Sequence, residues 1–307
     1  MTATFGTNDV MTSGTQRRSK LSNVVKVSPS VEIALVREYP PLPFVSIKHL
    51  FDTVAERRNL LEENPDKLQY ISFSNVTVST VVAVEKCREQ RRLHFRQTYF
   101  PDIQTLIIKV PSCIHERAHT NLGFELVRRY HDMGMKRAEF YGWGATTTKS
   151  RNQSPGQTHS SKEGDSSFKN KLLRPGNDFP SLMIEVGNLE SISHLRMAAH
   201  WWIEHSDGRV NIVILVKIEK AKKRVTFYKY VPRPPSTQFP GLRSIPSVKA
   251  TQVAEIVIDQ STSPSPISGA PLILEFTAVF DRQPNPPREK DLVLSGQDLD
   301  GLISEMW

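Results

Sequence analysis

The segment Pro180–Gly187 reads Pro-Ser-Leu-Met-Ile-Glu-Val-Gly and places one acidic residue, Glu185, inside a run of apolar side chains. A short apolar run bounded by proline and glycine is typical of a buried β-strand. An ionised carboxylate is costly to bury unless a cation or a hydrogen-bond donor pairs with it. The segment therefore predicts an interior strand and, for Glu185, a cationic partner.

A second apolar run, Val210–Ile218, is nearly continuous and predicts a strand that is covered on both faces. Apolar residues at helical spacing predict one helix over residues 115–133 and another over 191–205. Three strands are expected between these helices, over residues 138–143, at Asp165 and at Glu185. This order favours an α/β protein with a mixed β-sheet flanked by helices.

Composition divides the chain into three parts. We expect a disordered tail over residues 1–40, a basic N-terminal extension over 41–104 and the main domain over 105–307. The segments 145–164 and 232–250 lack periodicity, and the second is rich in proline, so both are predicted to be mobile loops.

The composition also limits the classes of protein to which the chain can belong. It has 307 residues and a formal net charge of +8, which permits but does not demand a nucleic-acid partner. No apolar run approaches the roughly 18 residues of a membrane span, and the N-terminus lacks the apolar core of a secretory signal. Two cysteines without a CxxC pair favour a reducing compartment, so an intracellular location in the cytoplasm or nucleus is expected. The basic residues near Arg17 leave mitochondrial targeting open.

Arg88, Arg92 and Arg96 are spaced four residues apart and are predicted to share one face of a helix. The simpler interpretation is a solvated helix face. The functional interpretation is a stripe that contacts phosphate groups of a nucleic acid.

Asp165 and Glu185 are twenty residues apart and are predicted to lie on neighbouring strands. Two carboxylates on adjacent strands can hold a divalent cation such as Mg²⁺ or Mn²⁺, and Asp178 could add a further ligand. The alternative is a purely structural role, in which Glu185 is paired with an arginine such as Arg196.

Four segments together resemble a known family. They are Lys162-Glu-Gly-Asp-Ser-Ser-Phe, Phe179-Pro-Ser-Leu-Met-Ile-Glu-Val-Gly, His194-Leu-Arg-Met-Ala-Ala-His-Trp-Trp and Val210-Asn-Ile-Val-Ile-Leu-Val-Lys-Ile. The set is similar to a family of uncharacterised fungal proteins with a restriction-endonuclease-like core of the PD-(D/E)XK superfamily, and distantly to the bacterial Uma2-type endonucleases. The resemblance covers about residues 105–307.

The resemblance implies a metal-dependent nuclease, or a degenerate relative of one, with Asp165 and Glu185 as the metal-binding acids. The superfamily expects a lysine two residues after the second acid, where this chain has Gly187. A lysine from another element would then orient the attacking water, and Lys217 and Lys169 are the candidates. Glu125 on the first helix could also face the metal.

Two further function classes compete with a nuclease. His115-Glu116-Arg-Ala-His119 fits the HExxH pattern of zinc proteases, in which two histidines one helical turn apart bind the metal. The pattern lies at the start of its predicted helix and lacks a third ligand at protease spacing, so a helix-capping role for His115 and Glu116 is the simpler interpretation. The other class is a non-enzymatic nucleic-acid-binding or protein-interaction protein on the same fold.

Overall fold

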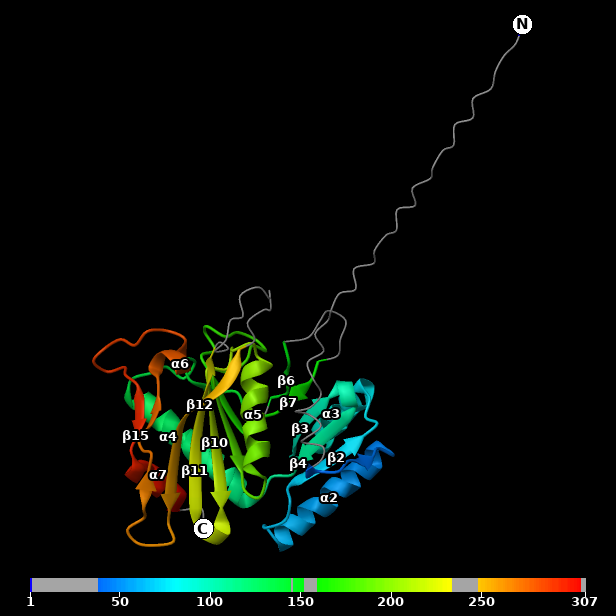
Figure 1. Ribbon diagram of the computed structural model, residues 1–307, viewed down its shortest axis with the longest axis horizontal. Coiled ribbons are helices and arrows are strands. Elements are labelled where there is room, and N and C mark those ends of the chain that lie inside the picture. Colours follow the sequence, from blue (N-terminus) through cyan, green and yellow to red (C-terminus); the bar gives the residue numbers. More distant parts are fainter. Residues whose placement is uncertain (2–37, 145, 152–158, 234–247, 305–307) are drawn as a thin grey trace.

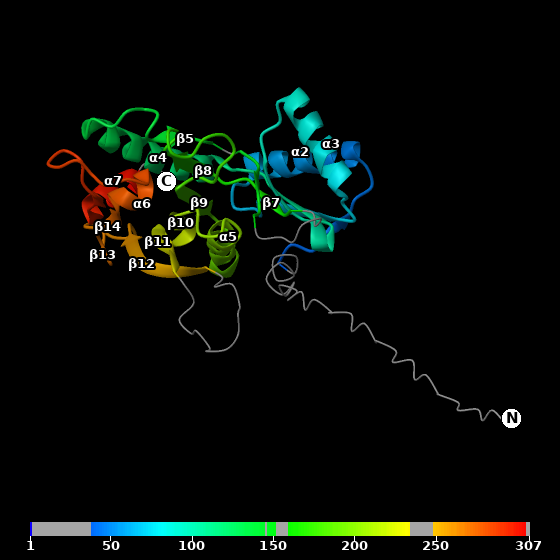
Figure 2. The same ribbon diagram turned by 90° about the horizontal axis from the view of Figure 1, so that it is seen from above.

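The computed structural model of the chain describes residues 1, 38–144, 146–151, 159–233 and 248–304. Nearly all of the predicted tail and parts of both predicted loops lie outside these residues. The described residues form two large mixed β-sheets and one two-stranded sheet. The two large sheets lie side by side, each covered by helices (Figures 1 and 2).

The first large sheet has the strand order β1-β2-β4-β3-β7-β6. Its strands are β1 (Leu42–Pro43), β2 (Tyr70–Ser74), β3 (Arg96–Phe100), β4 (Thr105–Lys109), β6 (Thr148–Lys149) and β7 (Ser161–Lys162). The helices α2 (Ile47–Glu63) and α3 (Val78–Arg91) pack on one face of the sheet, where apolar side chains of both helices and of β2 and β4 form one core. Ser46 and Thr77 cap these helices by accepting backbone N–H groups of the first turn.

The second large sheet has the strand order β13-β12-β11-β10-β9-β8-β5. Its strands are β5 (Tyr141–Gly142), β8 (Ser166–Lys169), β9 (Leu182–Gly187), β10 (Ile212–Glu219), β11 (Arg224–Arg233), β12 (Lys249–Asp259) and β13 (Ile267–Ser268). Only β9 and β10 pair in parallel within this sheet. A parallel pair needs a crossover connection, and helix α5 (Ile192–Glu204) provides it.

Helices cover both faces of the second sheet. Ile184, Val186 and the even-numbered residues of β10 share a core with helix α4 (Cys113–Asp132), whereas Met183, Val213 and Leu215 share a core with α5. Alternating residues of a strand point to opposite faces, so strands covered on both faces read as continuous apolar runs. The apolar runs around Glu185 and over Val210–Ile218 have this origin, and the expected α/β class with a mixed sheet flanked by helices is confirmed.

Helix α5 also joins the two large sheets. Its core includes Phe100 and Ile107 of the first sheet as well as residues of β9 and β10. Trp201 and Trp202 point in directions about 100° apart on the helix, yet both are buried because α5 has neighbours on more than one side.

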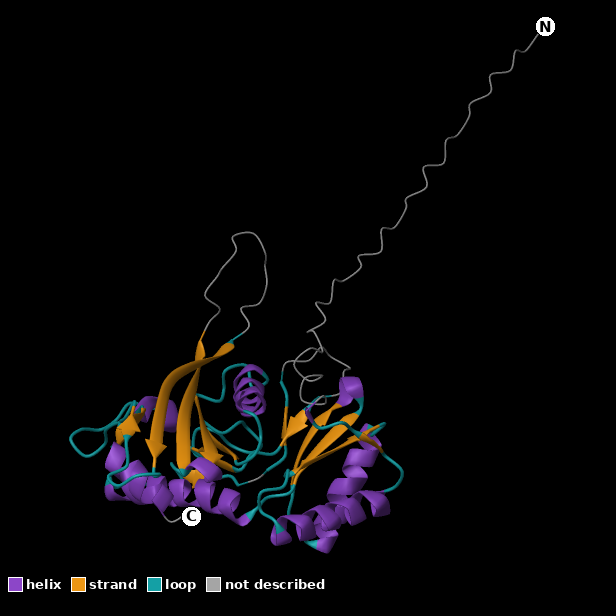
Figure 3. Ribbon diagram, turned by 60° about the horizontal axis from the view of Figure 1, so that its bottom comes forward, coloured by secondary structure: helices purple, strands orange, loops and turns teal. Residues whose placement is uncertain are grey.

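The C-terminal residues pack beside α4 and extend its core. They form a hairpin of β14 (Leu272–Leu274) and β15 (Leu292–Leu294), the short helix α6 (Phe276–Phe280) and the helix α7 (Gly296–Ser304). Figure 3 shows these elements at the edge of the second sheet, away from the first. None of the described helices combines the length and the apolar character that crossing a membrane requires.

The first sheet differs from the predicted division of the chain. Strand β4 begins at residue 105, yet it pairs with both β2 and β3 inside the first sheet, and all five of its side chains are buried. The predicted loop 145–164 contributes the short strands β6 and β7 to the same sheet. The boundary expected at residue 105 therefore cuts through a sheet that spans both parts.

The three arginines do not share a helix face. Helix α3 ends at Arg91, Arg92 adopts a left-handed conformation with φ 52° at its C-cap, and Arg96 belongs to strand β3. The left-handed cap turns the chain away from the helix axis, which the four-residue spacing alone could not reveal.

Candidate functional site

A cluster of charged side chains is buried where the two large sheets meet. It contains Lys109 of β4, His115 of α4, Lys162 of β7, Asp165 before β8, Glu185 of β9 and Glu190 after β9. Apart from the partly buried Lys162, each of these residues is at most 6% exposed. Charges removed from water to this degree need partners in the fold, and the partners define the chemistry of the site.

Asp165 is held by cations and by the backbone. One of its carboxylate oxygens, Oδ2, accepts hydrogen bonds from Lys109 Nζ at 2.9 Å and from the Val186 N–H at 2.8 Å, and lies 2.9 Å from His115 Nε2. Burial raises the pKa of Asp165, but His115 and Lys109 outweigh it and hold the pKa well below its usual range. Its second oxygen, Oδ1, is buried and has no hydrogen-bond partner among the described residues.

Glu185 lies beside Asp165 and has different partners. The β8–β9 register pairs Ser166 with Ile184, and continuing it by one residue places Asp165 opposite Glu185. The Trp202 indole N–H donates to Glu185 Oε1 at 2.5 Å, and Lys162 Nζ lies 3.3 Å from the same oxygen. Burial and the nearby Asp165 raise the pKa of Glu185 against the opposing effect of Lys162.

Glu190 is a third buried carboxylate, and it occupies the space beside Gly187. It accepts a hydrogen bond from the Tyr70 hydroxyl at 2.8 Å and lies 3.9 Å from Lys109 Nζ. A Cβ atom at Gly187 would lie 2.7 Å from Glu190 Cγ and Oε1. Any larger residue at position 187 would therefore displace Glu190. Burial raises the pKa of Glu190.

Lys109 carries an ammonium group to the same place from another strand. Its Nζ donates to the Val186 carbonyl oxygen at 2.7 Å as well as to Asp165. Burial lowers the pKa of Lys109, but the nearby carboxylates of Asp165 and Glu190 raise it by more than burial lowers it. The net pKa is therefore raised, and this lysine stays charged. The ammonium group thus lies next to the peptide that precedes Gly187.

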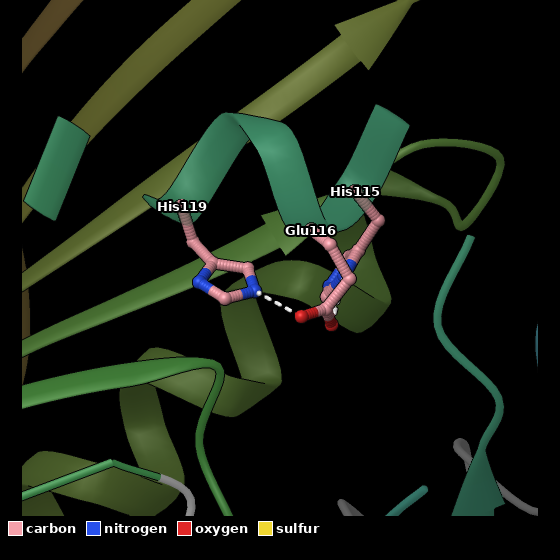
Figure 4. Close-up of side chains that lie close together, drawn as sticks. All are labelled: His115, Glu116 and His119. Carbon is pink, nitrogen blue, oxygen red and sulfur yellow. Dashed lines mark ion pairs between the residues drawn. The ribbon is translucent and has the colours of Figure 1, made fainter. Parts of the chain in front are cut away.

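A group of possible metal ligands adjoins this cluster at the start of α4. The ligand atoms of His115, Glu116 and His119 all lie within 4.8 Å of one another. Glu116 Oε1 is 3.5 Å from His115 Nδ1, and Glu116 Oε2 is 3.3 Å from His119 Nε2. Figure 4 shows the three side chains converging from one face of the helix. Burial raises the pKa of Glu116, but the two imidazoles and Arg96 hold it well below its usual range.

Lys217 and Lys169, the lysines predicted to replace one at position 187, do not contact the carboxylates of the cluster. Lys217 donates to the backbone carbonyls of Asn188 at 3.0 Å and Glu190 at 2.6 Å. Lys169 donates to the carbonyls of Gly176 at 2.7 Å and Asp178 at 3.2 Å. Both ammonium groups support loops, whereas Lys109 and Lys162 contact the carboxylates.

Three other residues singled out in the sequence also have partners away from the cluster. The Asp178 carboxylate pairs with Arg151 and Arg209, and Glu125 pairs with Arg128 and Arg129 on the outer part of α4. The guanidinium of Arg196 lies over the ring of Tyr228 instead of beside Glu185. The cationic partner predicted for Glu185 is Lys162.

Two of the three arginines are close to the cluster. Arg88 makes a bidentate ion pair with Glu163, at 2.7 and 2.8 Å. Arg96 lies 3.6 Å from Glu116 Oε1. Arg92 is exposed.

A narrow cavity reaches the cluster between the sheets. It has a volume of about 10 Å³, enough for roughly one water molecule, and its lining includes Tyr70, Arg96, Lys109, Lys162 and Glu185. The site is therefore polar and closed to anything larger in this conformation.

Sequence reasoning missed Lys109 and Lys162. Lys109 ends the apolar run Thr105-Leu-Ile-Ile-Lys, and a charge in an apolar strand is the same signal that singled out Glu185. Lys162 carried no such signal, because it lies in a segment without periodicity.

No model of a known protein family matches this chain, and no curated protein matches it.

Proposed function

We propose that this chain is a metal-dependent nuclease with a restriction-endonuclease-like core. The observation that carries the proposal is the buried pair of carboxylates on adjacent strands, Asp165 and Glu185, with the ammonium group of Lys109 beside Asp165. Hydrolysis of a phosphodiester needs carboxylates for the metal and a cation for the developing charge. The order of α4, β5, β8, β9, α5 and β10 supports the proposed core.

The donor set fits a hard divalent cation. Asp165 Oδ1 is a buried carboxylate oxygen without a partner, as a metal ligand would be in the absence of its ion. Carboxylate oxygens are the ligands that Mg²⁺ and Mn²⁺ prefer. Asp165 and Glu185 would hold the ion, which when bound would act as a Lewis acid and polarise the phosphodiester.

Lys109 takes the role that the family assigns to a lysine at position 187. A side chain at 187 would collide with Glu190, whereas Lys109 reaches the Val186 carbonyl and Asp165 from the neighbouring sheet. Its ammonium group can orient water beside Asp165 and can stabilise negative charge on a phosphate oxygen. This assignment replaces Lys217, whose ammonium group is engaged by two backbone carbonyls.

One observation favours a second candidate, a binding protein on the same fold without activity. Both acids already have cationic partners, and both are 3% exposed. An enzyme must let a phosphodiester reach them, and this requires the two sheets to separate around the narrow cavity. A binding protein needs no such opening, and the exposed Arg92 would then contact nucleic acid at the surface.

Cleavage of labelled single- and double-stranded DNA and RNA in Mg²⁺ or Mn²⁺ tests the proposal. Glu185→Gln keeps an oxygen for the Trp202 N–H and removes the charge, so we expect cutting to be lost by at least about 100-fold. Glu219→Gln changes a glutamate of β10 that pairs with the exposed Lys222 and should cut normally. Absence of cutting by the wild-type chain in every metal would favour the binding protein, and cutting that survives Glu185→Gln would contradict the assigned site.

A further inference from the structure

The start of α4 holds two histidines whose inward ring nitrogens lack hydrogen-bond partners. His115 Nδ1 and His119 Nε2 are buried and make no hydrogen bond with any described residue. The side chain of His115 is fully buried and that of His119 is 6% exposed. Buried polar atoms in native folds are almost always hydrogen-bonded, so an unpartnered pair points to a missing ligand.

The outward nitrogens of both rings are held in place. His115 Nε2 lies 2.9 Å from Asp165 Oδ2, and His119 Nδ1 lies 2.8 Å from the Ser166 hydroxyl. An ionised carboxylate only accepts, so His115 donates from Nε2 and, as a neutral ring, presents a lone pair at Nδ1. A His119 that donates to Ser166 likewise presents a lone pair at Nε2. Metal-binding histidines in proteins have such partners on the second nitrogen.

Both lone pairs face the carboxylate of Glu116. Its oxygens are 3.5 Å from His115 Nδ1 and 3.3 Å from His119 Nε2. Three electron-rich groups that face one another repel unless a proton or a metal cation lies between them. The ligand atoms of a tetrahedral site with bonds of about 2.1 Å are about 3.4 Å apart. The two contacts of Glu116 match this spacing, but the three ligand atoms lie within 4.8 Å of one another, so the side chains would have to close around an ion.

We propose that His115, Glu116 and His119 bind Zn²⁺, with the fourth coordination position open to water. Two imidazoles and a carboxylate suit Zn²⁺ better than Mg²⁺, which prefers oxygen ligands. Glu116 is a ligand in this site, whereas the glutamate of the HExxH pattern in zinc proteases acts as a base. The site shares no ligand with the proposed Mg²⁺ site on Asp165 and Glu185, although His115 Nε2 contacts Asp165 Oδ2 at 2.9 Å.

The residues around the site allow an ion to enter and influence which fourth ligand it would bind. The side chain of Glu116 is 41% exposed, so an ion can enter from that side. Arg96 lies 3.6 Å from Glu116 Oε1 and competes with the ion for that oxygen, but Oε2 faces His119. Arg96 also adds positive charge beside the site, which favours water or an anion as the fourth ligand.

Zinc binding by the full chain tests the proposal. Protein stripped with a chelator and freed of it is titrated with Zn²⁺ against a chromophoric competitor, and Co²⁺ absorbance reports tetrahedral coordination. We expect one equivalent to bind, and His119→Ala to weaken binding by at least about 100-fold. Ser166→Ala removes only the partner of His119 and should weaken binding by about 10-fold.

A matched control is available on α5. His200 lies 3.0 Å from Glu204 in an i,i+4 pair on a helix, and its side chain is 43% exposed. His200→Ala should therefore leave Zn²⁺ affinity unchanged. Glu116→Gln, at a partly exposed position, is the second ligand variant in case His119→Ala does not fold, and it should weaken binding by at least about 10-fold.

Two results of the titration would overturn the proposed Zn²⁺ site. A wild-type chain that binds no Zn²⁺ would overturn the proposal, because protons on the imidazoles would then balance Glu116. Binding that is unchanged in both ligand variants would place the ion elsewhere and overturn it too. Glu185→Gln should retain Zn²⁺ binding, so failure of the nuclease proposal is distinguishable from failure of the zinc site.

Discussion

Replacement of Lys109 by methionine tests whether the charges between the sheets are truly desolvated. The substitution keeps most of the side-chain volume and removes the ammonium group that contacts Asp165 at 2.9 Å and lies 3.9 Å from Glu190. Breaking one half of a buried ion pair leaves an uncompensated charge and costs about 3–5 kcal/mol of the free energy of unfolding. With an unfolding entropy of about 2.1 cal/mol/K per residue, that loss lowers the melting temperature of a 307-residue chain by roughly 5–8 °C.

The same substitution at an exposed ion pair is the control. Lys48 and Asp52 are 2.7 Å apart, and their side chains are 83% and 55% exposed. Exposed pairs of this kind contribute about 0.3–0.5 kcal/mol, so Lys48→Met should barely change the melting temperature. The two substitutions remove the same chemical group, and they differ in burial.

Thermal and urea unfolding, followed by the fluorescence of the buried tryptophans, measures both variants. The penalty at Lys109 should shrink as the pH falls, because burial raises the pKa of Glu190 and the uncompensated carboxylate can then take a proton. Adding Asp165→Asn to Lys109→Met should recover about 1–3 kcal/mol relative to the sum of the single losses. A loss at Lys109 below about 1 kcal/mol, equal to that at Lys48, would refute the argument that this cluster is excluded from water.

Three further results are expected. Burial lowers the pKa of His194 to about 3, so between that value and about 6.5 the unfolded state binds the additional proton. Stability therefore falls as the pH decreases, by about 1.4 kcal/mol at pH 5.5, and His194→Gln should remove this part of the pH dependence of the unfolding free energy. Gly269→Ala should cost at least about 2 kcal/mol in urea unfolding, because φ is +77° and a Cβ would lie 1.9 Å from a backbone oxygen, whereas Gly301→Ala, in open space on a helix, should not destabilise the fold. Trp202→Phe removes the indole donor to a buried carboxylate and should cost about 1–3 kcal/mol more than Trp201→Phe, whose ring nitrogen has no hydrogen-bond partner among the described residues.

Periodicity predicted the parts of the fold that bury long apolar patterns. The helix expected over 115–133 is α4, Cys113–Asp132, and the one expected over 191–205 is α5, Ile192–Glu204. Both patterns fill a helix face against the second sheet, and Ser191 caps α5 by accepting the His194 N–H at 3.1 Å. In such segments, local spacing and tertiary packing require the same residues.

Pairing between distant segments was not predictable in the same way. Strands β6 and β7 have two residues each, too few to show alternation, and they exist because β7 pairs with β3. The strand expected over 138–143 is reduced to Tyr141–Gly142. Helix α3 ends because Arg92 at its C-cap adopts a left-handed backbone conformation. The spacing of the arginines in the sequence does not predict this conformation.

In the candidate site too, local patterns were predictable and contacts between distant segments were not. A carboxylate in an apolar strand signalled that Glu185 needs a partner, but the identity of the partner depends on a fold that brings Lys162 from the other sheet. Glu190 fills the space that a side chain at position 187 would need. The sequence shows that position 187 is not a lysine, but it does not reveal that Lys109, 78 positions earlier, contacts Asp165.

The two proposed centres are linked through Asp165. Its Oδ2 atom is shared by Lys109 and His115, while Oδ1 remains without a partner. Removing Asp165 would therefore disturb an ammonium group on one side and a candidate Zn²⁺ ligand on the other, and a loss of activity in that variant would identify neither. Glu185→Gln touches only the first centre and His119→Ala only the second. Substitutions on either side of Asp165 can thus separate the chemistry of the two centres, which a substitution of Asp165 itself would confound.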